Sequence, residues 1–137
     1  MPHLLHKDPT HPLNLPTLRH PYPTPGNIYI NRKTGEVSCL IDWQHAIIQS
    51  NLLAAGYPRT FENPDSEIPS DLREPILPDD VSNVSPADQS VARELHRRRL
   101  AFYHYHIFNG HVNKPHIDAM RDPLLFERQL LVDQASR

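Results

Sequence analysis

An amide and a carboxylate flank the stretch of this sequence whose residue types are best suited to chemistry. Residues 28–30 and 37–41 are short apolar runs, and residues 31–36 between them read Asn-Arg-Lys-Thr-Gly-Glu. Two apolar runs around a polar turn with a glycine predict an antiparallel β-hairpin. Asn27 precedes the first run and Asp42 follows the second, so strand pairing brings both to one end of the sheet. Such oxygen ligands bind magnesium together with phosphate groups.

A proline-rich loop that begins with His20 leads into this hairpin. Three prolines within residues 21–25 restrict the backbone and remove hydrogen-bond donors, so the loop is expected to hold its side chains in place. His20, Asn27 and Asp42 then form a candidate magnesium and phosphate site. On spacing alone, a loop histidine, a turn asparagine and a strand-end cap explain the same residues equally well, and both explanations stay open.

The remaining elements are predicted from apolar spacing and helix caps. Ser85 and Pro86 are typical of an N-cap and a first helical position, and Asp88 adds a carboxylate to the first turn. The helix predicted over residues 43–55 is expected to pack its apolar side beneath the hairpin. The predicted elements are a strand over 17–20, a helix over 43–55, a long helix from Pro86 that fades at 109–110, a helix over 115–120 and a last helix after Asp122-Pro123.

These elements predict an α+β fold that is mainly helical, in a single partial domain over residues 1–137. Residues 1–60 hold the loop and the hairpin, and residues 88–137 are helical. Residues 61–87 between them are acidic and rich in proline, which is typical of a solvated connection.

Composition argues against several classes of function. The 137 residues carry a net charge of −2, whereas a generic nucleic-acid binder needs a basic surplus. No apolar run approaches the ~20 residues of a membrane-spanning helix. The first residues lack the features of a signal or transit peptide, so no targeting signal is expected in this chain.

Histidine and cysteine do not suggest a transition-metal site. Ten histidines are present, but their spacing disfavours zinc, because His104 and His106 point to different faces of the predicted long helix. The single cysteine, Cys39, lies inside a predicted strand, where we expect a buried and inert thiol. One cysteine forms no intrachain disulfide, which favours a reducing compartment.

The order of these segments resembles a known family. A histidine followed by Pro-Gly-Asn-Ile over residues 20–28, then a hairpin, then Ile-Asp-Trp-Gln-His-Ala over 41–46, is similar to the aminoglycoside phosphotransferase and choline-kinase-like branch of the kinase fold. The fungal phosphotransferase-domain proteins, some of them associated with mitochondria, look most similar. Further blocks of the resemblance, which covers nearly the whole chain, are residues 4–9, 15–21, 55–59, 94–100 and 113–125.

The resemblance implies roles for four residues. In the family the loop reads His-x-Asp-x-x-x-x-Asn, where the aspartate accepts the proton of the substrate hydroxyl and the asparagine binds magnesium, while a later aspartate holds the metal against ATP. His20 matches the histidine, and Asn27 and Asp42 match the two metal ligands. Tyr22 stands at the position of the base. A phenol with a pKa near ~10 is protonated at neutral pH and does not replace a carboxylate.

The resemblance therefore implies a fragment of an ATP- and magnesium-dependent kinase of small hydroxyl compounds, predicted to be inactive because Tyr22 stands at the base position and the nucleotide-binding small lobe is missing. It implies the C-terminal lobe, with no residues for the nucleotide-binding small lobe before His20. A lobe without its partner exposes apolar surface, so self-association is expected. The implied location is cytoplasmic or mitochondrial. The alternative is a pseudokinase-type module that binds a protein through its helical half, around Tyr103 and Tyr105.

Overall fold

The computed structural model describes residues 4–66 and 71–135, which form an α+β fold that is mostly helical with two small two-stranded sheets. Residues 67–70 of the predicted connection lie outside the described residues. The strands are β1 (Pro16–Arg19), β2 (Ile28–Ile30), β3 (Val37–Leu40) and β4 (Ile47–Ser50). The α-helices are α1 (Asn51–Ala54), α2 (Pro86–Val112), α3 (Lys114–Met120) and α4 (Leu125–Ala135), and the 3-10 helices are η1 (Pro12–Asn14), η2 (Pro25–Asn27), η3 (Arg59–Phe61) and η4 (Asp79–Asn83).

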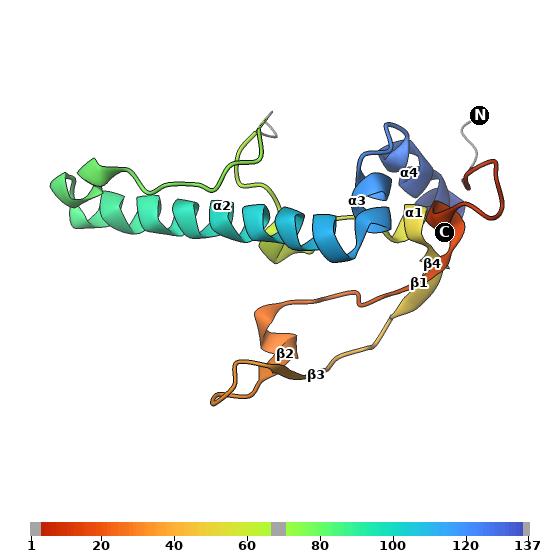
Figure 1. The fold of residues 1–137 in the computed structure, drawn as a ribbon, viewed down its shortest axis with the longest axis horizontal. Coiled ribbons are helices and arrows are strands. Elements are labelled where there is room, and N and C mark those ends of the chain that lie inside the picture. Colours follow the sequence, from red (N-terminus) through yellow and green to blue (C-terminus); the bar gives the residue numbers. More distant parts are fainter. Residues whose placement is uncertain (1–3, 67–70, 136–137) are drawn as a thin grey trace.

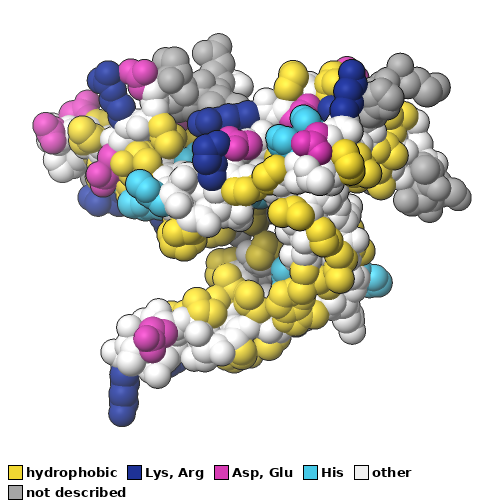
Figure 2. All heavy atoms as spheres, turned by 45° about the vertical axis from the view of Figure 1, so that its right-hand side comes forward, with side chains coloured by type: hydrophobic (Ala, Val, Ile, Leu, Met, Phe, Trp, Pro, Cys, Tyr) yellow, Lys and Arg dark blue, Asp and Glu magenta, His cyan; other side chains and the backbone are white. Residues whose placement is uncertain are grey.

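The long helix α2 lies along the longest axis of the molecule, and the short helices α1, α3 and α4 gather at its C-terminal end (Figure 1). The ribbon of β1 and β4 leads away from this helical cluster to the hairpin of β2 and β3, which runs back below α2. We call residues 16–50, which hold both sheets, the arm. Figure 2 shows hydrophobic side chains along the arm and a hollow between the arm and the helices.

The first part of the predicted helix over residues 43–55 is wrong. Residues 47–50 form β4, which pairs antiparallel with β1 from Pro16 opposite Ser50 to Arg19 opposite Ile47. The β-branched pair Ile47-Ile48 suits a strand, and β1 supplies the partner that the local spacing did not reveal. Within residues 43–55, helical structure is confined to α1, where the Ser50 side chain accepts a hydrogen bond from the Leu53 amide.

The hairpin is confirmed, with Ile28 opposite Leu40 and a register shift after Tyr29. Gly35 in the turn has φ of +74°, a conformation that glycine adopts without strain. The expectation that α1 and its flanking residues pack beneath the hairpin is wrong, because α1 contacts η1, β1, β4, α3 and α4 instead. With no helix over it, Cys39 is exposed, so the prediction of a buried thiol is also wrong.

Helix α2 begins as predicted. The Ser85 side chain accepts a hydrogen bond from the Asp88 amide, and Pro86 occupies the first turn. The helix continues past Gly110 to Val112, and the predicted end at residues 109–110 is two residues early. The connection is fastened to α2 by a bidentate ion pair between Asp65 and Arg99, with oxygen to nitrogen distances of 2.6 and 2.8 Å.

The core lies where the short helices meet. It contains Leu13, Leu52, Ala55 and Ala119, with Met120 and Leu125 packed against it. Leu13 belongs to the N-terminal segment, which has few local signals but is held by the turn of η1. Phe102 of α2 is also buried but lies outside this cluster, and its ring contacts Tyr57. No helix in the described part of the chain is long and apolar enough to cross a membrane.

Candidate functional site

His20 fastens the loop to the end of β3. Its Nε2 atom lies 2.8 Å from the Ile41 carbonyl oxygen, and its Nδ1 atom accepts a hydrogen bond from the Tyr22 amide at 3.1 Å. A neutral imidazole with its proton on Nε2 satisfies both contacts. The Trp43 ring adds a T-shaped contact to the His20 ring, with ring centroids 4.6 Å apart. His20 therefore positions the loop against the residue that precedes Asp42.

Asn27 is held to the same residue from the other side. Its backbone oxygen accepts a hydrogen bond from the Ile41 amide at 3.0 Å. Its side-chain nitrogen Nδ2 donates to the Tyr22 carbonyl oxygen at 2.9 Å, which turns the amide into the loop. Because Nδ2 serves the loop, Oδ1 is the amide atom that suits a metal ion.

Asp42 is exposed and follows β3 with φ of +64°. Left-handed backbone is uncommon outside glycine, although aspartate and asparagine tolerate it best. Such strain is often found at functional sites. The structure thus brings His20, Asn27 and Asp42 to one end of the β2–β3 sheet, as the sequence predicted.

Tyr22 has a structural role through its backbone. Its carbonyl oxygen accepts hydrogen bonds from Thr24 N at 2.8 Å and from Asn27 Nδ2 at 2.9 Å. The residue is 59% exposed and lines a cavity. The phenol therefore occupies open space at the position where the resemblance expects the base.

This cavity has a volume of about 780 Å³ and lies between the first part of the arm and the helical cluster. Its wall includes β1, the loop after it, α1, and the junction between α2 and α3. The side chains that bear charge, rings or amides on its wall are Arg19, His20, Tyr22, Asn51, Tyr57, Arg59, Glu62, Tyr105, Asn113 and His116.

Sequence reasoning assigned no role to Arg19, Tyr57 and His116, and it placed Tyr105 on a protein-binding face rather than in a cavity wall. Arg19, Tyr57 and His116 belong to the sequence blocks that carry the family resemblance. Membership of these blocks was the only signal that singled them out. It did not indicate that residues far apart in the chain line one cavity.

Two tyrosine–histidine pairs stand beside this cavity. Tyr105 Oη lies 2.7 Å from His116 Nε2, and Tyr57 Oη lies 2.5 Å from His106 Nε2. Burial, with a contribution from Tyr57, raises the pKa of Tyr105 to about 12, and burial also raises the pKa of Tyr57. Burial lowers the pKa of both histidines. At neutral pH each phenol therefore keeps its proton and donates a hydrogen bond to a neutral imidazole.

The hairpin end carries two side chains with oxygen atoms of the type that magnesium prefers. In the described residues no three His, Cys, Asp or Glu side chains come together as a metal site. Asn27 and Asp42 nevertheless supply one amide and one carboxylate oxygen at one end of a sheet. Magnesium is commonly held by one or two protein oxygens, with water and phosphate as its other ligands.

Comparison with known proteins gives two curated relatives. Both are described as a subtelomeric hrmA-associated cluster protein, from two strains of Aspergillus fumigatus, and each is 34% identical over 119 residues. The matched region covers 87% of this chain but 23% of each relative, so the chain spans about a quarter of their length. No family model and no solved structure matches the chain.

Proposed function

We propose that this chain is the C-terminal lobe of an aminoglycoside-phosphotransferase-like, ATP-dependent kinase of small molecules. In this proposal it carries the metal-binding half of the active site and is catalytically incompetent. The observation that supports it best is the double attachment to Ile41. The His20 ring donates to the Ile41 carbonyl oxygen and the Asn27 carbonyl accepts from the Ile41 amide, so Asn27 lies beside the residue that precedes Asp42.

Each residue has one task in this proposal. Asn27 and Asp42 would hold magnesium, and the metal would neutralise charge on the phosphate oxygens of ATP. His20 would be a positioning residue, since both of its nitrogens serve the backbone of the loop and hairpin. The fungal origin of the relatives agrees with the proposed family.

The proposed incompetence depends on Tyr22. A general base must carry an unprotonated acceptor near the reacting hydroxyl, and a carboxylate does so at neutral pH. A phenol is protonated there and is an acceptor only through its neutral oxygen. The chain therefore retains ligands for the metal but no carboxylate at the base position of the loop.

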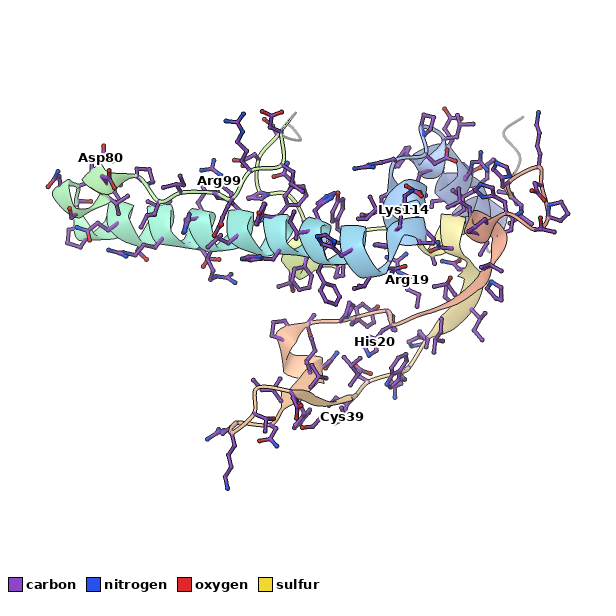
Figure 3. All side chains as sticks on the ribbon, in the orientation of Figure 1. Arg19, His20, Cys39, Asp80, Arg99 and Lys114 are labelled. Atoms are coloured by element: carbon purple, nitrogen blue, oxygen red, sulfur yellow. The ribbon has the colours of Figure 1, made fainter. Side chains whose placement is uncertain are left out.

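Paramagnetic broadening by Mn²⁺ tests the metal half. With ATP present, we expect Mn²⁺ to broaden the amide NMR signals of Asn27 and Asp42 first, and Asp42→Asn to remove the effect. Asp80→Asn is the matched control, because Asp80 is exposed and lies at the far end of the molecule (Figure 3). Broadening of the same signals that is unchanged in Asp42→Asn would refute the proposal.

A turnover assay tests the incompetence separately. We expect no release of ADP above background from the 137-residue chain with Mg²⁺, ATP and a panel of amino sugars and amino alcohols. Turnover that disappears in Asp42→Ala would show an active enzyme and overturn this part of the proposal. The metal half would stand in that case, so the two failures are distinguishable.

We also keep the pseudokinase-type interaction module as a second candidate, with a different surface from the one expected. Tyr105 bonds to His116 and does not share an exposed face with Tyr103. Phe108 and Val112 are about two-thirds exposed and lie one helical turn apart on α2, which makes a small apolar contact surface. Loss of binding to a defined protein partner in a Phe108→Ser, Val112→Ser double variant would support this candidate.

A further inference from the structure

Arg19 lies inside the cavity wall rather than on the outer surface. It is the last residue of β1, half-buried, and directly precedes His20. Its guanidinium lies over Gly56, where an added Cβ would be 3.5 Å from Nη2. Figure 3 shows Arg19 on the side of the arm that faces the helical cluster.

No carboxylate pairs with this guanidinium among the described residues. The ion pairs of the described chain use other cations, which are Arg73, Arg97, Arg99, Lys114 and Arg128. Glu62 is the one acidic residue among the described residues of the cavity wall, where Arg59 is a second cation. Among the described residues, the cavity wall therefore carries one more basic than acidic side chain, and Arg19 has no ion-pair partner there.

The charge of Arg19 acts within the cavity. It opposes protonation of His116, where it adds to burial in lowering the pKa, and it favours ionisation of Tyr105. A cation that is partly removed from water without an anion loses hydration free energy. An anion in the cavity would restore it through charge-assisted hydrogen bonds, and a guanidinium binds carboxylate or phosphate oxygens in a bidentate manner.

The rest of the wall suits an organic ligand. Rings of Tyr57 and Tyr105 and several prolines line the cavity, and Asn51 and Asn113 add amides. A volume of about 780 Å³ lies within the usual range of small-molecule sites. An inorganic ion alone would leave these apolar walls without contacts.

We propose that this cavity binds a small organic molecule that carries an oxyanion, with Arg19 as the anchor of that group. The shared chemistry is a carboxylate or a phosphate monoester on an apolar body. The inference does not rest on the proposed kinase function, because it requires neither Asn27 nor Asp42 nor a metal ion.

The test is a calorimetric titration of the 137-residue chain in an amine buffer freed of metal ions by a chelating resin, which removes any metal contribution without adding a carboxylate. The probes are phenyl phosphate, benzoate and inorganic phosphate, with uncharged benzamide as the neutral analogue. We expect phenyl phosphate or benzoate to bind more tightly than benzamide, and the tighter of the two to identify the type of oxyanion. Inorganic phosphate should bind most weakly, since it contacts no apolar wall.

Arg19→Gln should weaken binding of the anionic probe by at least about tenfold, because it removes a charge-assisted contact. Arg32→Gln is the matched control, since Arg32 is exposed in the hairpin turn, and it should change the affinity by less than about twofold. Circular dichroism checks the fold of both variants. If Arg19→Gln does not fold, Arg19→Lys is the replacement, because lysine keeps the charge but cannot bind an oxyanion in a bidentate manner. Its affinity for the anionic probe should be lower than that of the wild type, by less than the roughly tenfold expected for Arg19→Gln.

Three outcomes would overturn the proposal. One is equal affinity for benzamide and for the anions, which would show that charge plays no part. Another is unchanged binding in Arg19→Gln, or equal affinity in wild type and Arg19→Lys where the first variant does not fold. The third is a lack of saturable binding of any anionic probe.

Discussion

At the scale of single residues, the Tyr105–His116 pair predicts a dependence of stability on pH. Burial, with smaller effects of Arg19 and His106, lowers the pKa of His116 in the folded chain. The unfolded histidine titrates near ~6.5, so between the two pKa values the unfolded chain binds more protons. The free energy of unfolding is therefore expected to fall as the pH drops below about 6.5.

Urea denaturation checks this prediction at about pH 7.5 and about pH 5.5, on either side of the ordinary histidine pKa. The midpoint should be lower at the acidic pH, and His116→Gln, which keeps an acceptor for Tyr105, should reduce the difference. His111→Gln is the control, because His111 is exposed at the end of α2. A midpoint that rises on acidification would contradict the assignment of a buried neutral imidazole.

At the same scale, chain order was enough to predict that Asn27 and Asp42 lie at one end of the hairpin, because they flank its two strands. The assignment of His20, Asn27 and Asp42 to a metal and phosphate site stays a proposal. Arg19 and His116 were not assigned a role. They are 97 residues apart, since 116 − 19 = 97, and only the packing of α3 near β1 brings them to one cavity. Periodicity carries no information about such a pair.

At the scale of elements, the start of α2 depends on one side chain. Ser85 accepts the Asp88 amide hydrogen bond at 3.2 Å, and its hydroxyl donates to the Asp88 carboxylate at 2.6 Å. We expect Ser85→Ala to lower the free energy of unfolding by about 1 kcal/mol, as is usual for an N-cap. Ser90→Ala in the same helix should be neutral or raise it by a few tenths, about the difference in helix propensity.

Urea unfolding of the two serine variants measures the difference. A loss in Ser90→Ala as large as that in Ser85→Ala would show that the cap is not the cause. The starts of α2 and α3 were predictable because caps and prolines are local signals, whereas β4 was not. Its strand conformation depends on pairing with β1. Even the pair nearest in sequence, Arg19 and Ile47, is separated by 28 residues, since 47 − 19 = 28.

At the scale of the whole molecule, the arm exposes apolar side chains that a small core does not cover. Leu18 and Ile48 pair across β1 and β4 and are 56% and 72% exposed. Exposed apolar pairs on a two-stranded ribbon favour association of chains. We expect the chain to self-associate with rising concentration, and Leu18→Thr with Ile48→Thr to shift it towards monomer.

Sedimentation velocity over a concentration series measures this association. Ile76→Thr is the control, because Ile76 is exposed singly in the connection. A compact monomer at every concentration, or an equal shift in the control variant, would contradict a role of the arm. The apolar surface was anticipated from the sequence, but its location on a two-sheet arm was not.

Local signals in the sequence determined the mainly helical α+β class, the hairpin, the caps of α2 and the order of His20, Asn27 and Asp42. Each depends on residues within a few positions of one another, so turn geometry and side-chain hydrogen bonds suffice. Tertiary structure alone decided the β1–β4 pairing, the burial of Leu13, the exposure of Cys39 and the cavity around Arg19. These depend on contacts between distant segments, where one element changes the conformation or environment of another.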